Sequence, residues 1–318
     1  MNLPWVESPF FEDELNNRKS LSNKDKEDAQ FYHQNGYLIL ENVFDKEFID
    51  RTRNNLTDNF DNRFSKTEPR VMNLWPESPE VKEIATNQII NDKLKMLYER
   101  EPIPFQTLNF KYGSRQQPHS DTIHFSSFPQ RYMCAAWVAL EDMDEHNGTV
   151  VYYPKSHKFN IYGYEDLIPD FNTAKETSDS LYVNRYEPFI KDLMEAKGLE
   201  TKVLRVKKGD VLIWSSNLIH GGLPVQDESR TRWSQVTHYF FDNCLYYTPQ
   251  LSNAVSGEWF LRKIQNIKTG KFTWGSYNGY KVKRKAVPGY KYLISDYASK
   301  NIRDIRFAFT RIYHRLLK

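Results

Sequence analysis

A histidine and a carboxylate stand two positions apart in the segment QQPHSDTIHFSSFP, which covers residues 116–129. The imidazole of His119 and the carboxylate of Asp121 are both good ligands for a divalent first-row metal. Two histidines and one carboxylate on one side of such a metal leave coordination positions open, as in non-haem iron sites that react with oxygen. The chain has 8 histidines, so this spacing also arises by chance, and the pair alone does not establish a site.

His220, in the segment GDVLIWSSNLIHGG, is the best candidate for a third ligand. A turn at Gly209 and Asp210 precedes an apolar stretch over 211–214, which predicts a strand. His220 follows at the end of this element, beside two glycines that allow another backbone segment to approach closely. The alternative for His220 is an ordinary loop histidine at a bend.

A basic and a hydroxyl side chain follow in the segment RTRWSQVTHYFF, residues 230–241. Arg232 and Ser234 are two residues apart on a predicted strand, so both side chains project from the same face. The planar guanidinium of arginine binds a carboxylate through two parallel hydrogen bonds. The pair therefore predicts a clamp for the distal carboxylate of a small molecule. For a lone arginine, an ion pair with a neighbouring acidic residue would be the simpler interpretation.

The elements that must position these side chains are mostly short strands. Segments rich in β-branched and aromatic residues, separated by turn residues, lie at 105–112, 131–141, 148–154, 202–206, 209–216 and 232–241. Helical patterns precede them over 24–34, 45–56 and 78–100, with Gly36 as a C-terminal cap and Asp45 as an N-terminal cap. The expected fold class is mainly β with flanking helices, built on a double-stranded β-helix core of jelly-roll or cupin-like type.

Three regions are expected along the chain. Residues 1–25 are polar with scattered aromatics and are expected to form an irregular N-terminal lead-in. Residues 26–258 are expected to form the jelly-roll domain, with a helical insertion at about 159–200. Residues 259–318 form a basic segment that is expected to end in an amphipathic helix, because the apolar residues of 299–318 fall on one stripe.

Charge is distributed unevenly over these regions. Residues 261–318 carry 15 Lys and Arg but 2 Asp and Glu, although the whole chain has 44 basic and 41 acidic residues. The simplest interpretation is a solvated segment that packs against an acidic body. The alternative is a surface for phosphate, nucleic acid, an anionic membrane or a partner protein. Of these, a nucleic-acid partner is not expected.

The composition is typical of a folded cytoplasmic protein. Aromatic residues make up 15% of the chain, which is enough bulk for a large core. No apolar run approaches the roughly 18 residues of a membrane span, and the N-terminal sequence does not resemble a secretory signal. The two cysteines, Cys134 and Cys244, do not form a disulfide framework, so a reducing location is expected.

These elements, in this order, resemble the phytanoyl-CoA dioxygenase family of Fe(II)- and 2-oxoglutarate-dependent oxygenases over about residues 30–242. FYHQNGYLILENVFDKEFID resembles the family's N-terminal helix–strand–helix entry, and PHSDTIHFSSFP matches its His-x-Asp loop. CAAWVALEDMDEHNGTVVYYPKSHK matches a strand, an Asn-Gly turn and a Pro-x-Ser-His-Lys segment. GDVLIWSSNLIHGG and the later SRTRWSQVTHYF match the distal histidine, the arginine and the closing strand.

The resemblance implies that His119, Asp121 and His220 bind iron. It implies that Arg232, helped by Ser234, binds the far carboxylate of 2-oxoglutarate. With O2 as the second co-substrate, the implied reaction hydroxylates a C–H bond of a small molecule and releases succinate and CO2. Relatives with alanine or glycine in place of the iron-binding carboxylate leave room for a halide. The presence of Asp121 therefore favours hydroxylation or another oxidation over halogenation.

Other site residues are implied less strongly by the resemblance. Trp137 matches a strand tryptophan that contacts the co-substrate in relatives, and Thr107, on the strand before the His-x-Asp loop, is a further candidate for that role. The candidates for contacting the main substrate are His124, Phe125 and Arg131.

Two positions depart from the family pattern. The spacing from His220 to Arg232 is one residue longer than expected, so Arg230 competes for the carboxylate-binding role. Gly222 stands where relatives often have serine, which removes one contact to the co-substrate.

Two other classes of protein remain open at this point: a non-catalytic jelly roll that binds a sugar or small ligand, and a cupin-type metal-dependent isomerase. Arg232 and Ser234 disfavour both, because neither class needs a built-in carboxylate clamp. The sequence does not specify the substrate. The basic C-terminal segment is consistent with an anionic or carrier-linked molecule, or with a membrane surface or partner that contacts the terminal helix.

Overall fold

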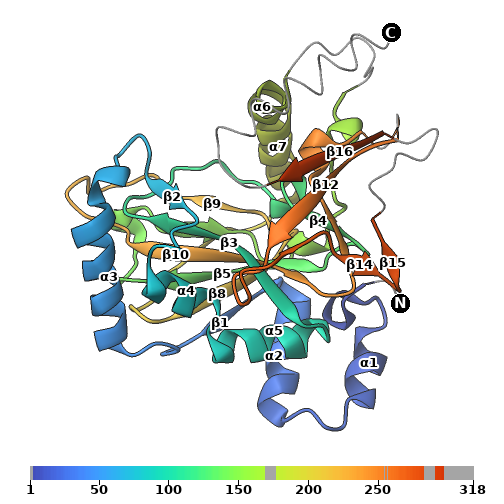
Figure 1. Cartoon of the computed structure of the whole chain (residues 1–318), viewed down its shortest axis with the longest axis horizontal. Helices are drawn as coiled ribbons and strands as arrows, with labels where there is room; N and C mark the ends of the chain where they lie inside the picture. The colour runs from blue at the N-terminus through green and yellow to red at the C-terminus, as the bar shows by residue number, and fades with distance from the viewer. Residues whose placement is uncertain (1–2, 169–176, 254, 256, 283–290, 297–318) are drawn as a thin grey trace.

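A six-stranded antiparallel sheet forms the centre of the protein (Figure 1). The computed structural model describes residues 3–168, 177–253, 255, 257–282 and 291–296. The strands of the sheet follow the order β1 (Tyr37–Leu40), β8 (Val211–Ser215), β5 (Met133–Ala139), β10 (Ser234–Phe241), β3 (Pro102–Phe110) and β2 (Arg70–Met72). Neighbours in this order come from distant parts of the sequence, so the sheet joins the first and second halves of the chain.

Smaller sheets complete the β structure. One consists of β7 (Lys202–Val203), β6 (Val150–Tyr152) and β9 (His220–Gly222). Another follows the order β13 (Phe272–Thr273), β12 (Glu258–Gln265), β11 (Leu245–Tyr247) and β4 (Ser126–Phe128), and β16 (Lys291–Asp296) pairs with β12 in parallel. A separate hairpin is formed by β14 (Ser276–Tyr277) and β15 (Tyr280–Lys281). The described part of the chain is therefore mainly β, as the sequence predicted.

Helices lie around the β structure (Figure 1). They are α1 (Phe11–Asn17), α2 (Asn23–Asn35), α3 (Lys46–Phe60), α4 (Pro79–Ala85), α5 (Gln88–Tyr98), α6 (Ser178–Leu181) and α7 (Glu187–Lys197). Of these, α2 to α5 pack against the central sheet. Both predicted caps are confirmed. The side chain of Asp45 accepts a hydrogen bond from Phe48 N at 2.7 Å at the start of α3. Gly36 ends α2 with a φ of 81°, a backbone conformation that glycine adopts without a steric penalty.

Alternation along the strands divides the core into two layers. On β5, Cys134, Ala136 and Val138 pack with α2 to α5 in one hydrophobic cluster. Ala135 and Trp137 point the other way, into a second cluster between the central sheet and the β6–β9 sheet. The second layer contains the polar cavity described below, and the helices give the sheet a dry backing on the opposite face.

The N-terminal residues are more ordered than expected. The expected irregular lead-in contains a 3-10 turn at Trp5–Glu7 and the helix α1. Trp5, Val6 and Phe11 are buried, and Trp5 Nε1 donates to Met96 O at the end of α5 at 3.0 Å. Local periodicity did not reveal this, because what orders the segment is burial against α5, about 90 residues later in the sequence.

Helices also occupy the expected insertion. Within 159–200 the structure has α6, a π-helical turn at Tyr182–Tyr186, and α7. Their buried side chains pack with Ile123 and Ile219 in a third hydrophobic cluster. This cluster places the insertion against the loops that carry His119 and His220.

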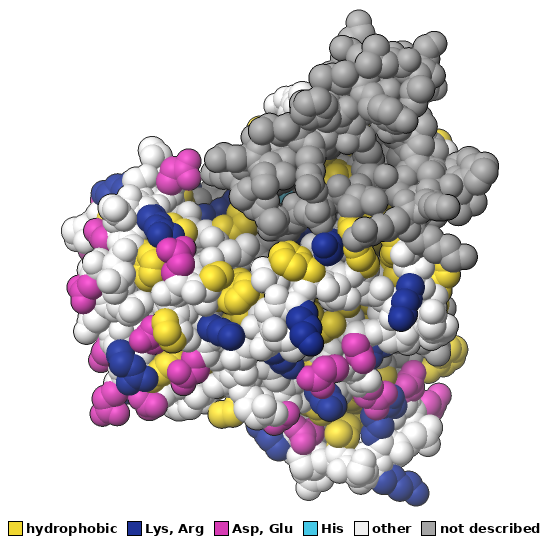
Figure 2. Space-filling view, in the orientation of Figure 1, with side chains coloured by type: hydrophobic (Ala, Val, Ile, Leu, Met, Phe, Trp, Pro, Cys, Tyr) yellow, Lys and Arg dark blue, Asp and Glu magenta, His cyan; other side chains and the backbone are white. Residues whose placement is uncertain are grey.

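The part of the C-terminal region that the structure describes is built from strands. β12 to β16 lie within 258–296, so this part of the basic segment is β structure. The predicted amphipathic helix at 299–318 lies outside the described residues. On the face shown in Figure 2, Lys and Arg side chains are interspersed with Asp and Glu side chains. Across the described ranges, no helix is long and apolar enough to cross a membrane.

Candidate metal centre

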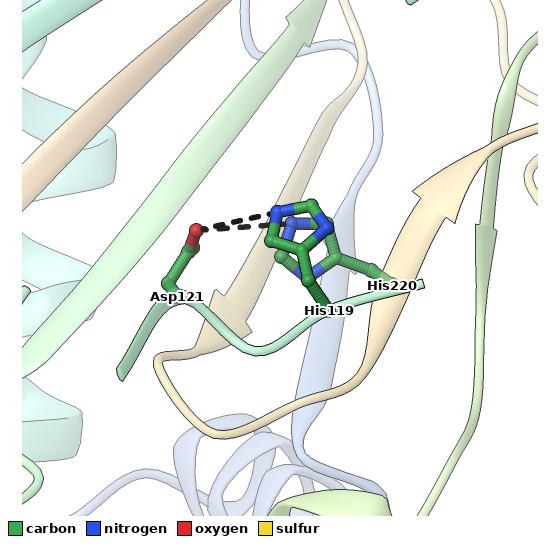
Figure 3. A group of neighbouring side chains, drawn as sticks. All are labelled: His119, Asp121 and His220. Atoms are coloured by element: carbon green, nitrogen blue, oxygen red, sulfur yellow. Dashed lines mark ion pairs between the residues drawn. The ribbon is translucent and has the colours of Figure 1, made fainter. Parts of the chain in front are cut away.

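Three side chains able to bind a metal meet where the loop after β3 passes β9 (Figure 3). His119 and Asp121 come from the loop, and His220 is the first residue of β9. Asp121 Oδ1 lies 3.9 Å from His119 Nε2 and 4.0 Å from His220 Nε2. One ligand atom from each residue lies within 4.8 Å of the others, and all three side chains are buried. The structure thus brings together the three residues that the sequence singled out.

Backbone and side-chain hydrogen bonds orient the two imidazoles. His119 N donates to His220 O at 2.9 Å, and His220 N donates to His119 O at 3.0 Å, so the two segments are tied together at these residues. Nδ1 of His119 lies 2.9 Å from Gln117 O, and Nδ1 of His220 lies 3.0 Å from Leu218 O. A carbonyl oxygen only accepts, so Nδ1 carries the proton in both rings. The lone pair of each Nε2 is left for a metal.

Asp121 is oriented by the indole of Trp214. Trp214 Nε1 donates to Asp121 Oδ2 at 2.8 Å, which leaves Oδ1 facing the histidines. Burial by itself would raise the pKa of Asp121, but His220, His238 and His119 together with this hydrogen bond outweigh it and lower the pKa. The carboxyl group is therefore ionised at neutral pH.

Burial also sets the protonation state of His119. Burial in the first place, and the neighbouring His220 in the second, lower the pKa of His119 to about 3. The imidazole is thus neutral at physiological pH and able to bind a metal without first losing a proton. A neutral imidazole, an ionised carboxylate and two oriented Nε2 atoms fit the donor set of a divalent metal.

A cavity of about 260 Å³ opens onto these ligands. This volume lies just below the range of small-molecule pockets, which begins at about 300 Å³. Gln116 also lines the cavity, and its Nε2 lies 3.1 Å from His119 Nε2. A metal bound at His119 takes the place of this hydrogen bond, so the Gln116 amide would lie beside the metal.

One end of the cavity is built around a buried arginine. Arg232 is 2% exposed, and its NH1 donates to Ser234 Oγ at 3.1 Å. The guanidinium carbon lies 4.8 Å from the ring centre of Phe110 and 6.0 Å from that of Trp137. Among the described residues, Arg232 Nε and Trp137 Nε1 are buried donors without a hydrogen-bond partner. An anionic ligand bound here would accept hydrogen bonds from both donors and would neutralise the buried guanidinium.

Arg232 stays charged despite its burial. Burial lowers the pKa of its guanidinium to about 10, and the nearby carboxylate of Glu141 opposes that shift. Arg230 is placed differently. Its NH1 donates to Asp144 Oδ1 at 2.8 Å, and its side chain is partly exposed at 33%. Arg230 is therefore held by an acidic partner outside the cavity, whereas Arg232 lines it.

Comparison with known proteins identifies the family. A model of the phytanoyl-CoA dioxygenase family (PhyH) matches residues 32–232, more than half of the chain. The chain belongs to the phytanoyl-CoA dioxygenase family. The match contains His119, Asp121 and His220 and reaches Arg232, so the family assignment and the site geometry concern the same part of the protein.

Two curated proteins of the phytanoyl-CoA dioxygenase family illustrate the sequence relationship. The chain is 25% identical over 227 residues to the human peroxisomal phytanoyl-CoA dioxygenase, covering 61% of this chain and 62% of that protein. It is 26% identical over 168 residues to a probable phytanoyl-CoA dioxygenase of Caenorhabditis elegans, covering 42% of this chain and 52% of that protein. The chain thus spans less than two thirds of either relative.

Solved structures support the fold of this family member. The carbocyclase SnoK from nogalamycin biosynthesis superposes with a TM-score of 0.54 at 17% identity, covering 75% of this chain and 91% of that chain. EctD from S. alaskensis with 2-oxoglutarate and 5-hydroxyectoine gives a TM-score of 0.55 at 17% identity, covering 87% and 89%. At this identity the similarity concerns the fold alone, and it confirms the predicted double-stranded β-helix.

Two of the residues singled out from the sequence are not brought to the cavity. Thr107 lies between Gln106 and Leu108, which line the cavity, so alternation along β3 turns Thr107 to the helix-covered face. Arg131 donates through NH1 to Glu7 Oε2 and to the carbonyl of residue 157, each at 2.7 Å. Arg131 is therefore captured by a carboxylate that precedes it by 124 residues, a partner that no local pattern reveals.

Trp137, Phe125 and His124 do line the cavity, and Ser234 is connected to it through its hydrogen bond with Arg232. Trp137 and Phe125 contribute ring faces, and His124 lies at the edge, where its Nδ1 is 2.7 Å from Gln250 Oε1. The ring of His124 is also 5.0 Å from that of Tyr182 in the helical insertion. The insertion therefore contacts a cavity-lining residue, His124, through Tyr182.

Gly222 has a steric role in this chain. A Cβ atom at this position would lie 2.5 Å from Ser114 Oγ and 2.9 Å from Arg115 N. Gly222 N also donates to Gln116 O at 2.9 Å, which holds the 114–116 segment directly against β9. A serine cannot occupy position 222 without moving this segment, which accounts for the departure from the family pattern.

Other cavity residues were missed from the sequence. Among them are Trp214, Gln116, His238, Gln106 and Arg262. A signal for His238 was present, because Arg232, Ser234, Val236 and His238 recur with a period of two on one predicted strand. Arg262 lies beyond the expected jelly-roll boundary at residue 258, and only the pairing of β11 with β12 brings it to the site.

Proposed function

We propose that this chain is a non-haem Fe(II)- and 2-oxoglutarate-dependent oxygenase that hydroxylates a C–H bond of a small molecule and releases succinate and CO2. One observation carries the proposal: a buried His–Asp–His cluster opens into the same cavity as a buried arginine with unpartnered donors around it. The first feature suits a metal and the second suits a carboxylate, and 2-oxoglutarate needs both.

His119, Asp121 and His220 are the proposed iron ligands. Their Nε2 and Oδ1 atoms converge, and the opposite atoms of all three side chains are fixed by hydrogen bonds to Gln117 O, Trp214 Nε1 and Leu218 O. Because the outer hydrogen bonds already hold the rings and the carboxylate in place, little ordering is left for the metal to impose. Gln116 would then offer its amide to a molecule bound beside the metal.

Arg232 is the proposed partner of the distal carboxylate of 2-oxoglutarate. Its charge persists at neutral pH, and a bidentate pair with a carboxylate would use donors that the protein leaves unused. Ser234 and Trp137 complete this end, since the hydroxyl holds the guanidinium and the indole offers Nε1–H. The aromatic walls of Phe110 and Trp137 exclude water around the ion pair.

The chemistry needs a cofactor, and the residues of the chain supply its placement. When bound, iron would activate O2, and 2-oxoglutarate would supply two of the four electrons that reduce O2, the other two coming from the C–H bond. The buried ligands keep Asp121 ionised and His119 neutral, and the cavity keeps the reacting groups away from bulk water. Asp121 occupies the position that a halide would need, so hydroxylation is proposed in preference to halogenation.

A spectroscopic and a chemical measurement test the proposal together. Anaerobic addition of Fe(II) and 2-oxoglutarate to the purified protein should produce a visible charge-transfer band that neither component gives alone. With O2, the same mixture should form succinate in an iron-dependent way, and a suitable small molecule should accelerate it. Absence of both the band and iron-dependent succinate would instead favour a non-catalytic ligand-binding jelly roll or a cupin-type isomerase.

The substrate is proposed to be a small molecule, anionic or linked to a carrier. The support is the basic composition of residues 261–318 and the exposed guanidinium of Arg70, which lies among the residues lining the cavity. A membrane surface or a partner that contacts residues 299–318 is the alternative use of that segment. Removal of 299–318 should weaken binding of an anionic substrate or of anionic vesicles. Unchanged turnover and unchanged binding would reject this part of the proposal.

A reducing, cytoplasmic location is part of the same proposal. Its support is that Cys134 and Cys244 are both buried free thiols. Localisation of a tagged full-length chain in its own cell is the direct test, and residence in an oxidising compartment would reject it.

A further inference from the structure

The two central strands of the cavity wall carry a second polar end. On β10, Val236 and His238 line the cavity and Ser234 lies on the same side of the strand, and their register partners on β3 are Leu108, Gln106 and Phe110. Going along the paired strands, the wall thus changes from the Arg232–Ser234 clamp through an apolar middle, Val236 and Leu108, to the His238–Gln106 pair. Ser234 and His238 are separated by roughly 13 Å of strand.

The His238–Gln106 pair is buried and incompletely satisfied. Gln106 is 4% exposed and His238 is 3% exposed. Gln106 Nε2 lies 3.5 Å from His238 Nδ1, the upper limit for a hydrogen bond, and Gln106 Oε1 is a buried acceptor without a partner in the described part of the chain. Most buried polar groups in folded proteins have a partner, so this pair calls for an explanation.

The hydrogen bond that exists determines what the pair offers a ligand. An amide NH2 group only donates, so Nδ1 of His238 accepts and the ring proton lies on Nε2. Burial lowers the pKa of His238 to about 4, so the ring is neutral at physiological pH. The pair therefore presents one N–H donor, from His238, and one oxygen acceptor, from Gln106, and neither group carries a charge.

The pair lines the same cavity as the metal centre. His238 and Gln106 share this cavity with His119, Asp121 and His220, and the ring centre of His238 lies 4.9 Å from that of Phe125 in its wall. A molecule held by His238 and Gln106 therefore occupies the cavity that opens onto the cluster, at the end of the strand away from Arg232.

We propose that His238 and Gln106 form the recognition site for the main substrate, and that they bind a neutral group that both donates and accepts a hydrogen bond: an amide or a hydroxyl. The inference rests on the proposed function and names the substrate class for it. The carbonyl or hydroxyl oxygen of such a group accepts from His238 Nε2, and its N–H or O–H donates to Gln106 Oε1. A carboxylate lacks the donor and would place its charge against the Gln106 oxygen.

The neighbouring polar groups provide the strongest rival. Arg262 NH1 donates to Thr248 Oγ1 at 2.7 Å, and its guanidinium carbon lies 4.7 Å from the ring centre of Phe125. Recognition by Arg262 would favour a carboxylate. Ligands that differ only in their end group therefore distinguish recognition by His238 and Gln106 from recognition by Arg262.

The test is a calorimetric titration of the full-length chain, in the presence of 2-oxoglutarate, with pentanamide, 1-pentanol and pentanoate. These probes share a chain length and differ in the end group. We expect pentanamide and 1-pentanol to bind more tightly than pentanoate. Gln106→Leu and His238→Phe should each weaken pentanamide binding by about 2–12-fold, the range of one neutral hydrogen bond. Binding of pentanoate should change little.

Control variants keep the result decisive. Asn109→Leu lies on β3 but faces the helices, so it should leave all three affinities unchanged. His238→Gln keeps an N–H donor and should restore part of the pentanamide affinity if His238→Phe fails to fold. Tighter binding of pentanoate, or equal affinities in wild type and both variants, would overturn the proposal.

The outcome of this test is independent of the outcome of the test of the proposed function. The charge-transfer band of the Fe(II)–2-oxoglutarate complex should keep its 2-oxoglutarate dependence in Gln106→Leu, since the clamp lies at the other end of the wall. Loss of the band in wild type would reject the oxygenase assignment, while the calorimetric affinities would still report on the His238–Gln106 pair.

Discussion

The two ends of the cavity wall on β10 are built on different chemistry. At the first end, Arg232 is a buried charge that stays ionised and is held by Ser234. At the second end, His238 and Gln106 are neutral, and their mutual hydrogen bond is long. A buried charge is costly unless it is paired and hydrogen-bonded, whereas a neutral pair tolerates a weak hydrogen bond. The Arg232–Ser234 end thus suits an anion. The His238–Gln106 end suits a neutral ligand that is recognised by its shape and its hydrogen bonds.

The ends also differ in how they relate to the family. The PhyH match runs to residue 232 and therefore includes Arg232 and Gln106, whereas His238 and the strands from β11 onward lie outside it. The following predictions separate the contributions of the two ends and of the metal centre.

The largest effect is expected from the metal ligands, on which both ends depend. His119→Ala should reduce Fe(II) affinity by more than about 100-fold, because the loss of a mere outer-shell partner already costs about 10–100-fold. Anaerobic titration with Fe(II) and the charge-transfer band measure this. His146→Ala, at an exposed histidine outside the cavity, is the matched control and should bind iron as wild type does. Equal affinity in the two variants would remove His119 from the site.

The charged end should respond next. Arg232→Ala removes charge-assisted hydrogen bonds worth about 1.5–3 kcal/mol, so the Kd for 2-oxoglutarate should rise about 10–150-fold while Fe(II) affinity is kept. Arg232→Lys restores the charge without the planar fork and should recover part of the loss. Arg230→Ala should leave the Kd unchanged, and a larger effect there than at Arg232 would reverse their assignment.

The orientation of Asp121 should matter slightly less. Trp214→Phe keeps an aromatic ring but deletes the donor to Asp121 Oδ2, so Fe(II) affinity should fall by about 10–100-fold. The measurement is the same iron titration, with the melting temperature as a check on packing. An unchanged iron affinity would show that the carboxylate keeps its orientation without the indole.

Ser234 tests the support of the clamp. Ser234→Ala deletes one hydrogen bond to the guanidinium, and the Kd for 2-oxoglutarate should rise by about 2–12-fold. If the loss instead equals that of Arg232→Ala, Ser234 and Arg232 act as one unit and the clamp cannot be divided between them.

A buried histidine away from the cavity should affect stability alone. Burial lowers the pKa of His157 to about 4, below the ordinary value of about 6.5. Between these values the unfolded chain binds a proton that the folded chain does not, so the free energy of unfolding falls as the pH drops from about 6.5 to about 4. The melting temperature of His157→Gln should therefore fall less steeply over this range, with both cavity ends unaffected. If the melting temperature of the wild type fell with the same slope as that of the variant, the lowered pKa of His157 would be wrong.

Much of the site could be predicted because its chemistry is encoded in short spacings. His119 and Asp121 share one loop, and Arg232 and Ser234 share one strand face, so each pair is local. The caps at Gly36 and Asp45 are local as well, and both are confirmed. The family resemblance joined these pairs to His220 and to the double-stranded β-helix, and the PhyH match agrees with it.

The residues that were misplaced or missed all depend on partners distant in sequence. Thr107 was assigned to the cavity, but the register of β3 against β10 turns it to the other face. Arg131 was assigned to the substrate, but Glu7 binds it. In each case the residue type was suited to the predicted role, and a contact formed only in the folded chain decided otherwise.

By itself, then, the sequence determined which residues have the chemistry of a metal and carboxylate site, because donor type and short spacing are properties of the chain. Tertiary structure decided which of them meet. The reciprocal backbone bonds of His119 and His220, the capture of Arg131, and the pairing of His238 with Gln106 all follow from strand register and burial. Strand register and burial depend on the packing of the whole core. A shift of one residue in the register would move a side chain from the cavity face of the sheet to the helix-covered face.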